Sequence, residues 1–377
     1  MNSTLKVMVI LLVCLTLGDF RFDAYAGGSS TNAQKGRVVK EFAPEVLEDR
    51  VIECVTPTKK LVVSKDQSGQ VMFYLTDFNF QNEKLIFSGR QENRHRVHLS
   101  PDGNYISIEN LKVGTVSVYL LKDEKIFEIK DSGKSVVSVS ISALTGEILY
   151  QAREHDIRKM PMVFKDDSDA RNPKFMTEGL GEVWAPNGKW FLVKKPSAAR
   201  RQEFATIKMP APPAYWYDAI CSPDGKELLV LKYGTGSWYN RWAPTSDKLV
   251  IAPQEENGFL VIGIVDSGGN LSATEIHHFI NGVDDFSEGI ISVDGNLIAY
   301  FKSIYTKDFE NYAKREVYIS TVDGSKNVQI EEFPGTSQLS IIWSAEGDLL
   351  ISENPTTQGE RTKIIEYPAT VVSQMLH

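Results

Sequence analysis

The stretch Val183-Trp184-Ala185-Pro186-Asn187-Gly188-Lys189-Trp190-Phe191 joins two apolar segments through a tight turn. Proline sets φ at the second turn position, Asn or Asp tolerates the third, and Gly accepts the positive φ with which the chain reverses. The same pattern returns as Ser100-Pro101-Asp102-Gly103 and as Ser222-Pro223-Asp224-Gly225, again between apolar runs. An apolar strand on each side of such a turn predicts a β-hairpin.

Degenerate copies continue this hairpin along the chain at a regular spacing. With the residue before each turn as the anchor, the copies stand at positions 54, 99, 141, 184, 242, 291 and 343. A period of about 40 to 50 residues is typical of one four-stranded propeller blade. A second hairpin follows within the period, for example 116–120 with 125–129. We therefore expect an all-β protein, a seven-bladed β-propeller of four-stranded antiparallel blades.

The number of blades depends on how the Ser222 turn is assigned. Its hairpin comes too soon before Trp242 to be a blade of its own, so we assign residues 215–233 to the outer half of the fourth blade. Eight or six blades stay open as alternatives, eight if residues 215–239 form a short separate blade.

The repeated Ser-Pro-Asp-Gly turn after an apolar or Trp residue resembles the TolB-type β-propeller repeat family, whose turns are similar to WD repeats. The resemblance covers roughly residues 50 to 377. It is a resemblance to the family and not to TolB itself, which carries a separate domain before its propeller. The resemblance implies a propeller fold, and it leaves function open, because the family includes interaction scaffolds, peptidase accessory domains and a few enzymes.

The amino end has the three-part layout of a secretory signal peptide. Lys6 precedes the apolar run 7–17, and Ala24-Tyr25-Ala26 follows as a cleavage site. We expect a signal peptide at 1–26, a lead-in at 27–50 and the propeller at 51–377, with no transmembrane span. Residues 37–42 can supply the strand that closes the ring, and residues 370–375 are the alternative. The net charge of −8 argues against nucleic acid as a partner.

The repeated tryptophans and the cysteines of the propeller are expected to have structural roles. Trp184, Trp242 and Trp343 occupy equivalent positions before their turns, and their size favours buried wedges between blades. Cys54 and Cys221 fall in the first and fourth blades, too far apart for a disulfide, so we expect two buried free thiols.

In an up-and-down blade, the connections between strands two and three, and those between blades, share one face. We call this the long-loop face and the opposite one the turn face. The connections predicted to be long lie on the long-loop face, at 153–181, 195–214, 232–240, 281–286, 302–315 and 352–361. Because recognition residues concentrate on loops held by a rigid scaffold, we expect binding there.

The candidate binding patch on this face is aromatic and cationic. Trp, Tyr and Arg dominate binding hot spots. The patch consists of Tyr215, Tyr217, Trp238, Tyr239 and Arg241, with Arg200 and Arg201. The alternative is that alternate members of each run belong to the core, since strand neighbours face opposite ways.

These observations favour an exported binding protein or scaffold that recognises a protein or peptide partner of the cell envelope, in the periplasm or outside the cell. The alternative is a metal-dependent lyase or hydrolase acting on acidic oligosaccharides, since some propellers of this repeat type resemble oligogalacturonate lyases. No catalytic motif, metal-ligand pattern or cofactor fingerprint is found in the sequence. We therefore assign no catalytic or metal residue, expect no cofactor, expect a monomer, and leave enzymatic activity undecided but disfavoured.

Overall fold

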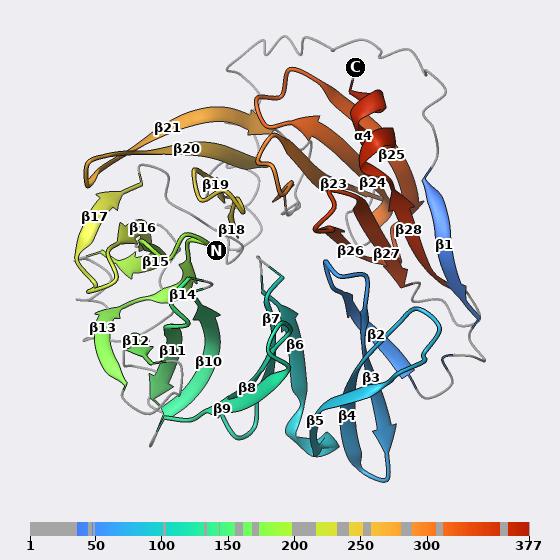
Figure 1. The fold of residues 1–377 in the computed structure, drawn as a ribbon, viewed down its shortest axis with the longest axis horizontal. Helices are drawn as coiled ribbons and strands as arrows, with labels where there is room; N and C mark the ends of the chain where they lie inside the picture. Colours follow the sequence, from blue (N-terminus) through green and yellow to red (C-terminus); the bar gives the residue numbers. More distant parts are fainter. Residues whose placement is uncertain are drawn as a thin grey trace, which may run out of the picture. The chain divides into compact units, whose positions relative to one another are not determined.

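Seven four-stranded antiparallel sheets form a ring in the computed structural model of this chain (Figure 1). The structure describes residues 36–376 except 44–46, 48–49, 101–102, 132–133, 143, 155–160, 168–172, 198–215, 232–240, 252–257, 280–288, 307–311 and 355–360, and the side chains of 181–182. The predicted seven-bladed propeller is confirmed, and the alternatives of six or eight blades are wrong. The expected signal peptide lies outside the described residues and stays a prediction.

Six blades are built from consecutive strands, and we number them in chain order. Blade I contains β2 (Arg50–Val55), β3 (Leu61–Gln67), β4 (Gln70–Thr76) and β5 (Lys84–Arg90), followed by the short 3-10 helix η1 (Gln91–Asn93). Blade II contains β6 (His95–Leu99), β7 (Tyr105–Asn110), β8 (Thr115–Leu120) and β9 (Lys125–Ile129). Blade III contains β10 (Lys134–Ile141), β11 (Ile148–Glu154), β12 (Met162–Asp166) and β13 (Lys174–Glu178). Blade IV contains β14 (Leu180–Trp184), β15 (Phe191–Pro196), β16 (Trp216–Cys221) and β17 (Glu227–Val230). Blade V contains β18 (Arg241–Trp242), β19 (Lys248–Ile251), β20 (Phe259–Ser267) and β21 (Asn270–Phe279). Blade VI contains β22 (Ile290–Ile291), β23 (Leu297–Tyr305), β24 (Tyr312–Thr321) and β25 (Asn327–Pro334).

Blade VII joins the two ends of the chain and closes the ring. It contains β26 (Gln338–Trp343), β27 (Leu349–Asn354) and β28 (Thr362–Tyr367), and its fourth strand is β1 (Arg37–Phe42). β1 pairs with β28 from Arg37 opposite Glu366 to Phe42 opposite Thr362. The expectation that residues 37–42 close the ring is confirmed. The alternative is wrong, because residues 370–375 lie in the helix α4 (Ala369–Met375).

The turns that the sequence predicted join the first two strands of their blades. Gly188 has φ +64° and closes its turn by donating its N–H to Ala185 O at 2.8 Å. A Cβ at this position would lie 2.7 Å from Ser142 Oγ in the turn of blade III. Turns of successive blades are also hydrogen-bonded, as where Asn187 N donates to Ser246 Oγ at 2.9 Å. The turn face is therefore closely packed around the axis.

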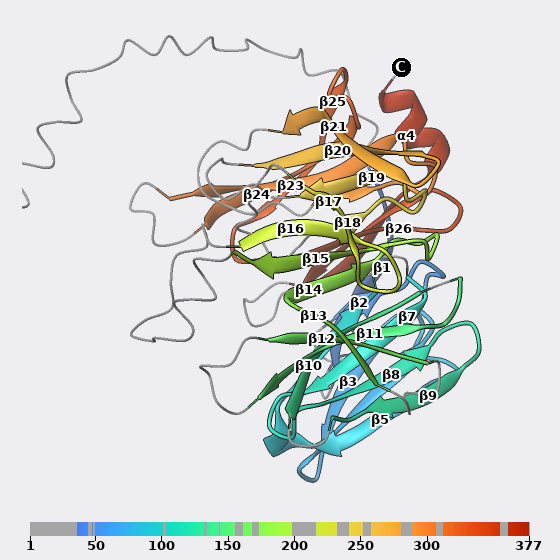
Figure 2. The same cartoon turned by 90° about the vertical axis from the view of Figure 1, so that its left-hand side faces the viewer.

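The core lies between neighbouring blades. Residues of one parity on a strand pack against the preceding blade and those of the other parity against the next. In β3, Val62 packs with Ile106 of blade II, whereas Val63 packs with Leu350 of blade VII. Figure 2 shows the blades edge-on, with their strands running from one face to the other. The strand interiors are apolar on both sides because each sheet is covered by two neighbours.

The tryptophan and cysteine predictions agree with this packing. Trp184, Trp242 and Trp343 are 4%, 5% and 4% exposed and lie in the clusters between blades. Cys221 is buried, Cys54 is half-buried against the cluster between blades I and II, and both thiols are free. The prediction that Cys54 and Cys221 form no disulfide is confirmed, and so is the burial of Cys221. Cys54 is less buried than predicted.

Two of the predicted loops are shorter than expected. The segment 153–181 contains the strands β12 and β13, and most of 302–315 belongs to β23 and β24. Both expectations were wrong because these strands mix apolar and charged residues, so their sequences lack a continuous apolar run. No helix in the described part of the chain is long and apolar enough to cross a bilayer.

Candidate functional site

A pocket of about 400 Å³ lies at the seam where blade VII meets blade I. Blade VII contributes the beginnings of β26 and β28 and the end of β27, and blade I contributes the beginning of β2. All four strand ends lie at the edge of the ring from which the long connections leave, so this pocket opens on the long-loop face. We call it the seam pocket, and its lining consists of Leu47, Arg50, Val51, Ile52, Glu53, Gln338, Leu339, Ser340, Asn354 and Thr362.

The blade VII side of the seam pocket presents uncharged polar groups. Gln338 lies opposite Asn354 in the sheet, and Ser340 lies two residues further along β26 on the same face. Asn354 Nδ2 donates to Ile52 O at 3.3 Å and so ties this wall to blade I. Gln338 is exposed and Ser340 is half-buried. Amide and hydroxyl side chains can each donate and accept hydrogen bonds, so this wall suits a polar ligand.

The blade I side carries a cation whose charge is already balanced. Arg50 NH2 lies 3.2 Å from Glu83 Oε1, and its guanidinium stacks over the Phe80 ring at 5.0 Å. Lys65 Nζ lies 2.7 Å from Glu83 Oε2 on the other side of the same carboxylate. Glu83 is thus shared by two cations on blade I.

Glu53 lines the seam pocket at the inner edge of blade I. It sits at an irregularity of β2, where the pairing with β3 shifts between Ile52 and Cys54. Its Oε1 accepts a hydrogen bond from Ser64 Oγ at 2.6 Å. Desolvation by the surrounding protein raises the pKa of Glu53, the bond from Ser64 partly opposes this, and the charge of Asp66 raises it further. The Glu53 carboxylate turns toward blade II, because Ser64 shares its face of β3 with Val62 of the cluster between blades I and II.

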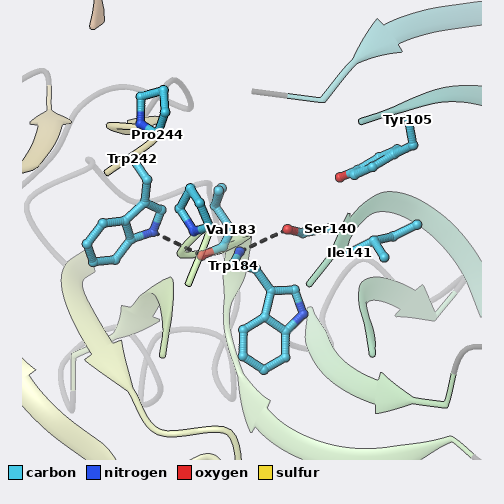
Figure 3. Close-up of a pocket in the computed structure, with 8 residues that line it drawn as sticks. Tyr105, Ser140, Ile141, Val183, Trp184, Trp242 and Pro244 are labelled. Atoms are coloured by element: carbon cyan, nitrogen blue, oxygen red, sulfur yellow. Dashed lines mark hydrogen bonds between the residues drawn. The ribbon is translucent and has the colours of Figure 1, made fainter. Parts of the chain in front are cut away.

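A second cavity, on the turn face, is too small to be a ligand site. It measures about 20 Å³ and is lined by residues of blades II to V (Figure 3), and a space of this size holds about one water molecule. Trp242 Nε1 donates to Val183 O at 3.2 Å, and Trp184 N donates to Ser140 Oγ at 2.9 Å. These bonds tie the inner strands together, which is a structural role.

The predicted aromatic and cationic patch is only partly within the described residues. Tyr217 lies at the beginning of β16 in blade IV, and Arg241 begins β18 in blade V. Both strands begin on the long-loop face of neighbouring blades, as expected. Tyr217 OH donates to Glu227 Oε2 at 3.2 Å. The other members lie outside the described residues, so the patch stays a prediction: Tyr215, Trp238, Tyr239, Arg200 and Arg201.

The sequence analysis missed the seam pocket. Its walls come from opposite ends of the chain and meet only after the ring closes, so no local pattern reveals them. Within the described ranges, no group of three or more His, Cys, Asp or Glu side chains is arranged to hold a metal ion.

Comparison with solved structures shows what this fold is similar to. An oligogalacturonate lyase in complex with manganese has a TM-score of 0.57 at 11% identity, covering 89% of this chain and 99% of that chain. The oligogalacturonate lyase of Vibrio parahaemolyticus has a TM-score of 0.56 at 11% identity, covering 88% and 98%. The β-propeller domain of Cps50 (Swd1) from Myceliophteria thermophila has a TM-score of 0.52 at 13% identity, covering 88% and 99%. At these identities the likeness shows the fold alone.

Structures named TolB are also among the similar ones. The TolB of Acinetobacter baumannii and a putative TolB of Agrobacterium tumefaciens have TM-scores of 0.38 and 0.44. Scores this low do not assign the chain to the TolB-type family, so membership of that family stays a prediction. No protein-family model matches the sequence, and no curated protein matches it.

Proposed function

We propose that this protein is an exported propeller that binds a protein or peptide partner on its long-loop face. The observation that carries the proposal is the seam pocket, which has a volume in the range of ligand sites and opens on that face. The turn face offers a contrast, since its turns pack against one another. Export to the periplasm or beyond rests on the layout of residues 1–26, and the monomeric state is part of the same proposal.

The alternative, a metal-dependent lyase or hydrolase of acidic oligosaccharides, shares only a fold with the oligogalacturonate lyases at 11% identity. No contact among the described residues favours it, so the binding role is the one that we propose.

The test is affinity capture from cell-envelope extracts with residues 27–377 as bait. The variants Gln338→Arg, which fills the seam pocket, and Trp238→Ala with Arg241→Ala, which removes the predicted patch, should each reduce capture of the same partner. Glu346→Arg provides the matched control, because Glu346 is an exposed residue in a turn of the opposite face. Capture that the long-loop variants leave unchanged, or that Glu346→Arg reduces equally, would contradict the proposal.

A further inference from the structure

We propose that Arg315 binds a carboxylate of the partner, from an Asp or Glu side chain or from the carboxyl end of its chain. This inference rests on the proposed function, and it names the chemical group that the partner presents to the long-loop face between blades VI and VII. The seam pocket is a different place, because it lies on the other side of blade VII.

Arg315 lies near the beginning of β24, on the side of blade VI that faces blade VII. Val317 follows it on the same side of the strand and belongs to the core cluster that blades VI and VII share. The Arg315 guanidinium lies over the Tyr312 ring at 5.0 Å and over the Phe301 ring at 5.7 Å. Tyr312 is the first residue of β24. The guanidinium is therefore held near the end of the blade from which the long connections leave.

The charge of Arg315 has no counter-ion among the described residues. Arg315 is half-buried, and the Nε of its guanidinium is enclosed without a hydrogen-bond partner, while its two terminal nitrogens reach the surface. Ser303 lies opposite Arg315 in the sheet and is 4% exposed, and its hydroxyl also lacks a partner within the described part of the chain. Because buried polar groups normally have partners, these two neighbours mark a place where hydrogen-bonding capacity is unused.

Two carboxylates of the interface between blades VI and VII have other partners. Glu353 of blade VII lies 3.6 Å from Lys363 Nζ. Glu331 of β25 accepts a hydrogen bond from Tyr367 OH at 2.7 Å. Neither of them lies within ion-pair distance of Arg315, so the guanidinium is left to a group from outside the described residues.

A carboxylate fits Arg315 better than other chemical groups do. A guanidinium can hold a carboxylate by two parallel N–H···O bonds, and stacking on aromatic rings orients its plane in advance. A cationic group would be repelled. The net charge of −8 opposes a polyanion such as nucleic acid, but salt screens distant charges beyond about 8 Å, so a single carboxylate at contact distance is bound locally. A peptide offers this group in its acidic side chains and at its carboxyl end.

The experiment uses short random peptides displayed on phage with a free carboxyl end, selected against immobilised residues 27–377. A selected peptide is then synthesised in two changed forms, one amidated at its carboxyl end and one with each acidic side chain replaced by the corresponding amide. One of the two changes should weaken binding about tenfold, because the bidentate charge pair is lost. The form that loses affinity tells whether the carboxylate comes from a chain end or from a side chain.

Variants of the protein test the other side of the same contact. Arg315→Met should bind the selected peptide about tenfold more weakly than wild type. Because Arg315 makes no hydrogen bond to described residues and Met also has a long unbranched side chain, melting curves should show that the variant folds. Lys326→Met is the matched control. It removes the same charge from an exposed side chain between β24 and β25, on the turn face of the same blade, and should bind like wild type.

The outcomes separate this inference from the proposed function. Equal binding by Arg315→Met and wild type, or a peptide that keeps its affinity after both changes, would overturn the inference and leave the binding role standing. Equal weakening by Lys326→Met would also overturn it, since net charge alone would explain the effect. So would a clear fall in the melting temperature of Arg315→Met, which would assign the residue a structural role.

Two further outcomes concern the kind of ligand. Tighter binding of a galacturonic acid trimer than of any selected peptide would assign Arg315 to a sugar acid and overturn the inference. Failure to select any peptide would overturn it as well, and the envelope capture then judges the binding role separately.

Discussion

Lys59 Nζ lies 2.6 Å from Glu366 Oε1, although the two residues are 307 positions apart in the chain. Lys59 is in the first turn of blade I, and Glu366 is near the end of β28 in blade VII. The same ammonium donates to Asp348 at 2.8 Å, and Arg37 of β1 lies 2.9 Å from the other oxygen of Glu366. Asp348 also accepts from the N–H of Ala369, the first residue of α4, at 2.9 Å. This cluster, the closure clasp, joins β1, β28 and the start of α4 to the first blade.

Replacing Lys59 should weaken the ring. Lys59→Met leaves Asp348 and Glu366, whose side chains are only 15% and 8% exposed, without their shared cation. Because hydrogen bonds to charged groups contribute about 1.5–3 kcal/mol, we expect the free energy of unfolding to fall by about 2 kcal/mol in urea titrations. The neighbouring Lys60→Met removes the same charge from an exposed side chain and should change it by about 0.5 kcal/mol or less. Similar losses for both variants would show that the clasp contributes nothing specific.

The closure clasp should also make stability depend on acid pH. Burial alone would raise the pKa of Asp348, but hydrogen bonds from Lys59 and from Ala369 N outweigh it and hold that pKa below its ordinary value. The unfolded chain therefore binds the proton more readily than the folded one. The contribution of Asp348 is complete above the unfolded pKa of about 3.9 and is lost as the pH falls through the lower folded value.

The variant Asp348→Asn isolates this effect. Urea unfolding at several pH values should show the largest loss of stability near neutral pH and a shrinking loss as the pH is lowered below about 4. A loss that stays constant over this range would mean that the carboxylate charge of Asp348 is not what stabilises the fold.

Removing the closing strand should have a larger effect than any clasp variant. Phe42 of β1 is 1% exposed, and its ring centroid lies 5.0 Å from that of Phe80 in blade I. Losing one such buried Phe costs about 3–5 kcal/mol, so deletion of residues 27–45 should lower the melting temperature by about 10 °C or more. Deletion of residues 27–35 stops before β1 and should leave the melting temperature nearly unchanged. A small effect of the longer deletion would mean that β1 does not support the ring.

Cys54 and Cys221 should both be unreactive in the folded protein. Burial raises the pKa of Cys221 to about 11, and burial together with the charge of Glu53 raises that of Cys54 to about 12. Because the thiolate is the reactive form, iodoacetamide at about pH 8 should label neither residue before unfolding and both in denaturant without reductant. Peptide mass mapping reports each site. Labelling of Cys54 in the folded state, or a need for reductant in denaturant, would contradict this prediction.

The sequence was sufficient to predict the blades because the turn and strand patterns that mark them are local. The turn at Ala185–Gly188 needs only its own residues, so the hairpin could be read from them. In the same way, the turn at Ser222 and its short distance from Trp242 were enough to assign β16 and β17 to blade IV. β12 and β13 were missed because their sequences, MVFKD and KFMTE, mix apolar and charged residues and contain no continuous apolar run.

The candidate site was not predictable in the same way. Gln338 and Arg50 come together only because β1 pairs with β28, which places the last blade beside the first. The aromatic patch was predicted from residue types alone, and its two described members lie on the expected face.

The equivalent tryptophans should differ in how much they stabilise the ring. Trp343 Nε1 donates to Ile290 O at 2.9 Å, and so ties blade VII to blade VI, whereas Trp184 Nε1 is buried without a hydrogen-bond partner among the described residues. Both substitutions replace the indole by a smaller phenyl ring, but Trp343→Phe also leaves the carbonyl of Ile290 without its donor, whereas Trp184→Phe removes an N–H that already lacks a partner among the described residues. Since an unsatisfied buried group costs about 1–3 kcal/mol, Trp343→Phe should destabilise the protein by at least about 1 kcal/mol more than Trp184→Phe in urea titrations. Trp242→Phe, which loses the comparable bond to Val183 O, should behave like Trp343→Phe. If the free energy of unfolding falls equally in all three variants, the loss of ring volume alone explains the destabilisation, and the hydrogen bonds between blades contribute nothing measurable.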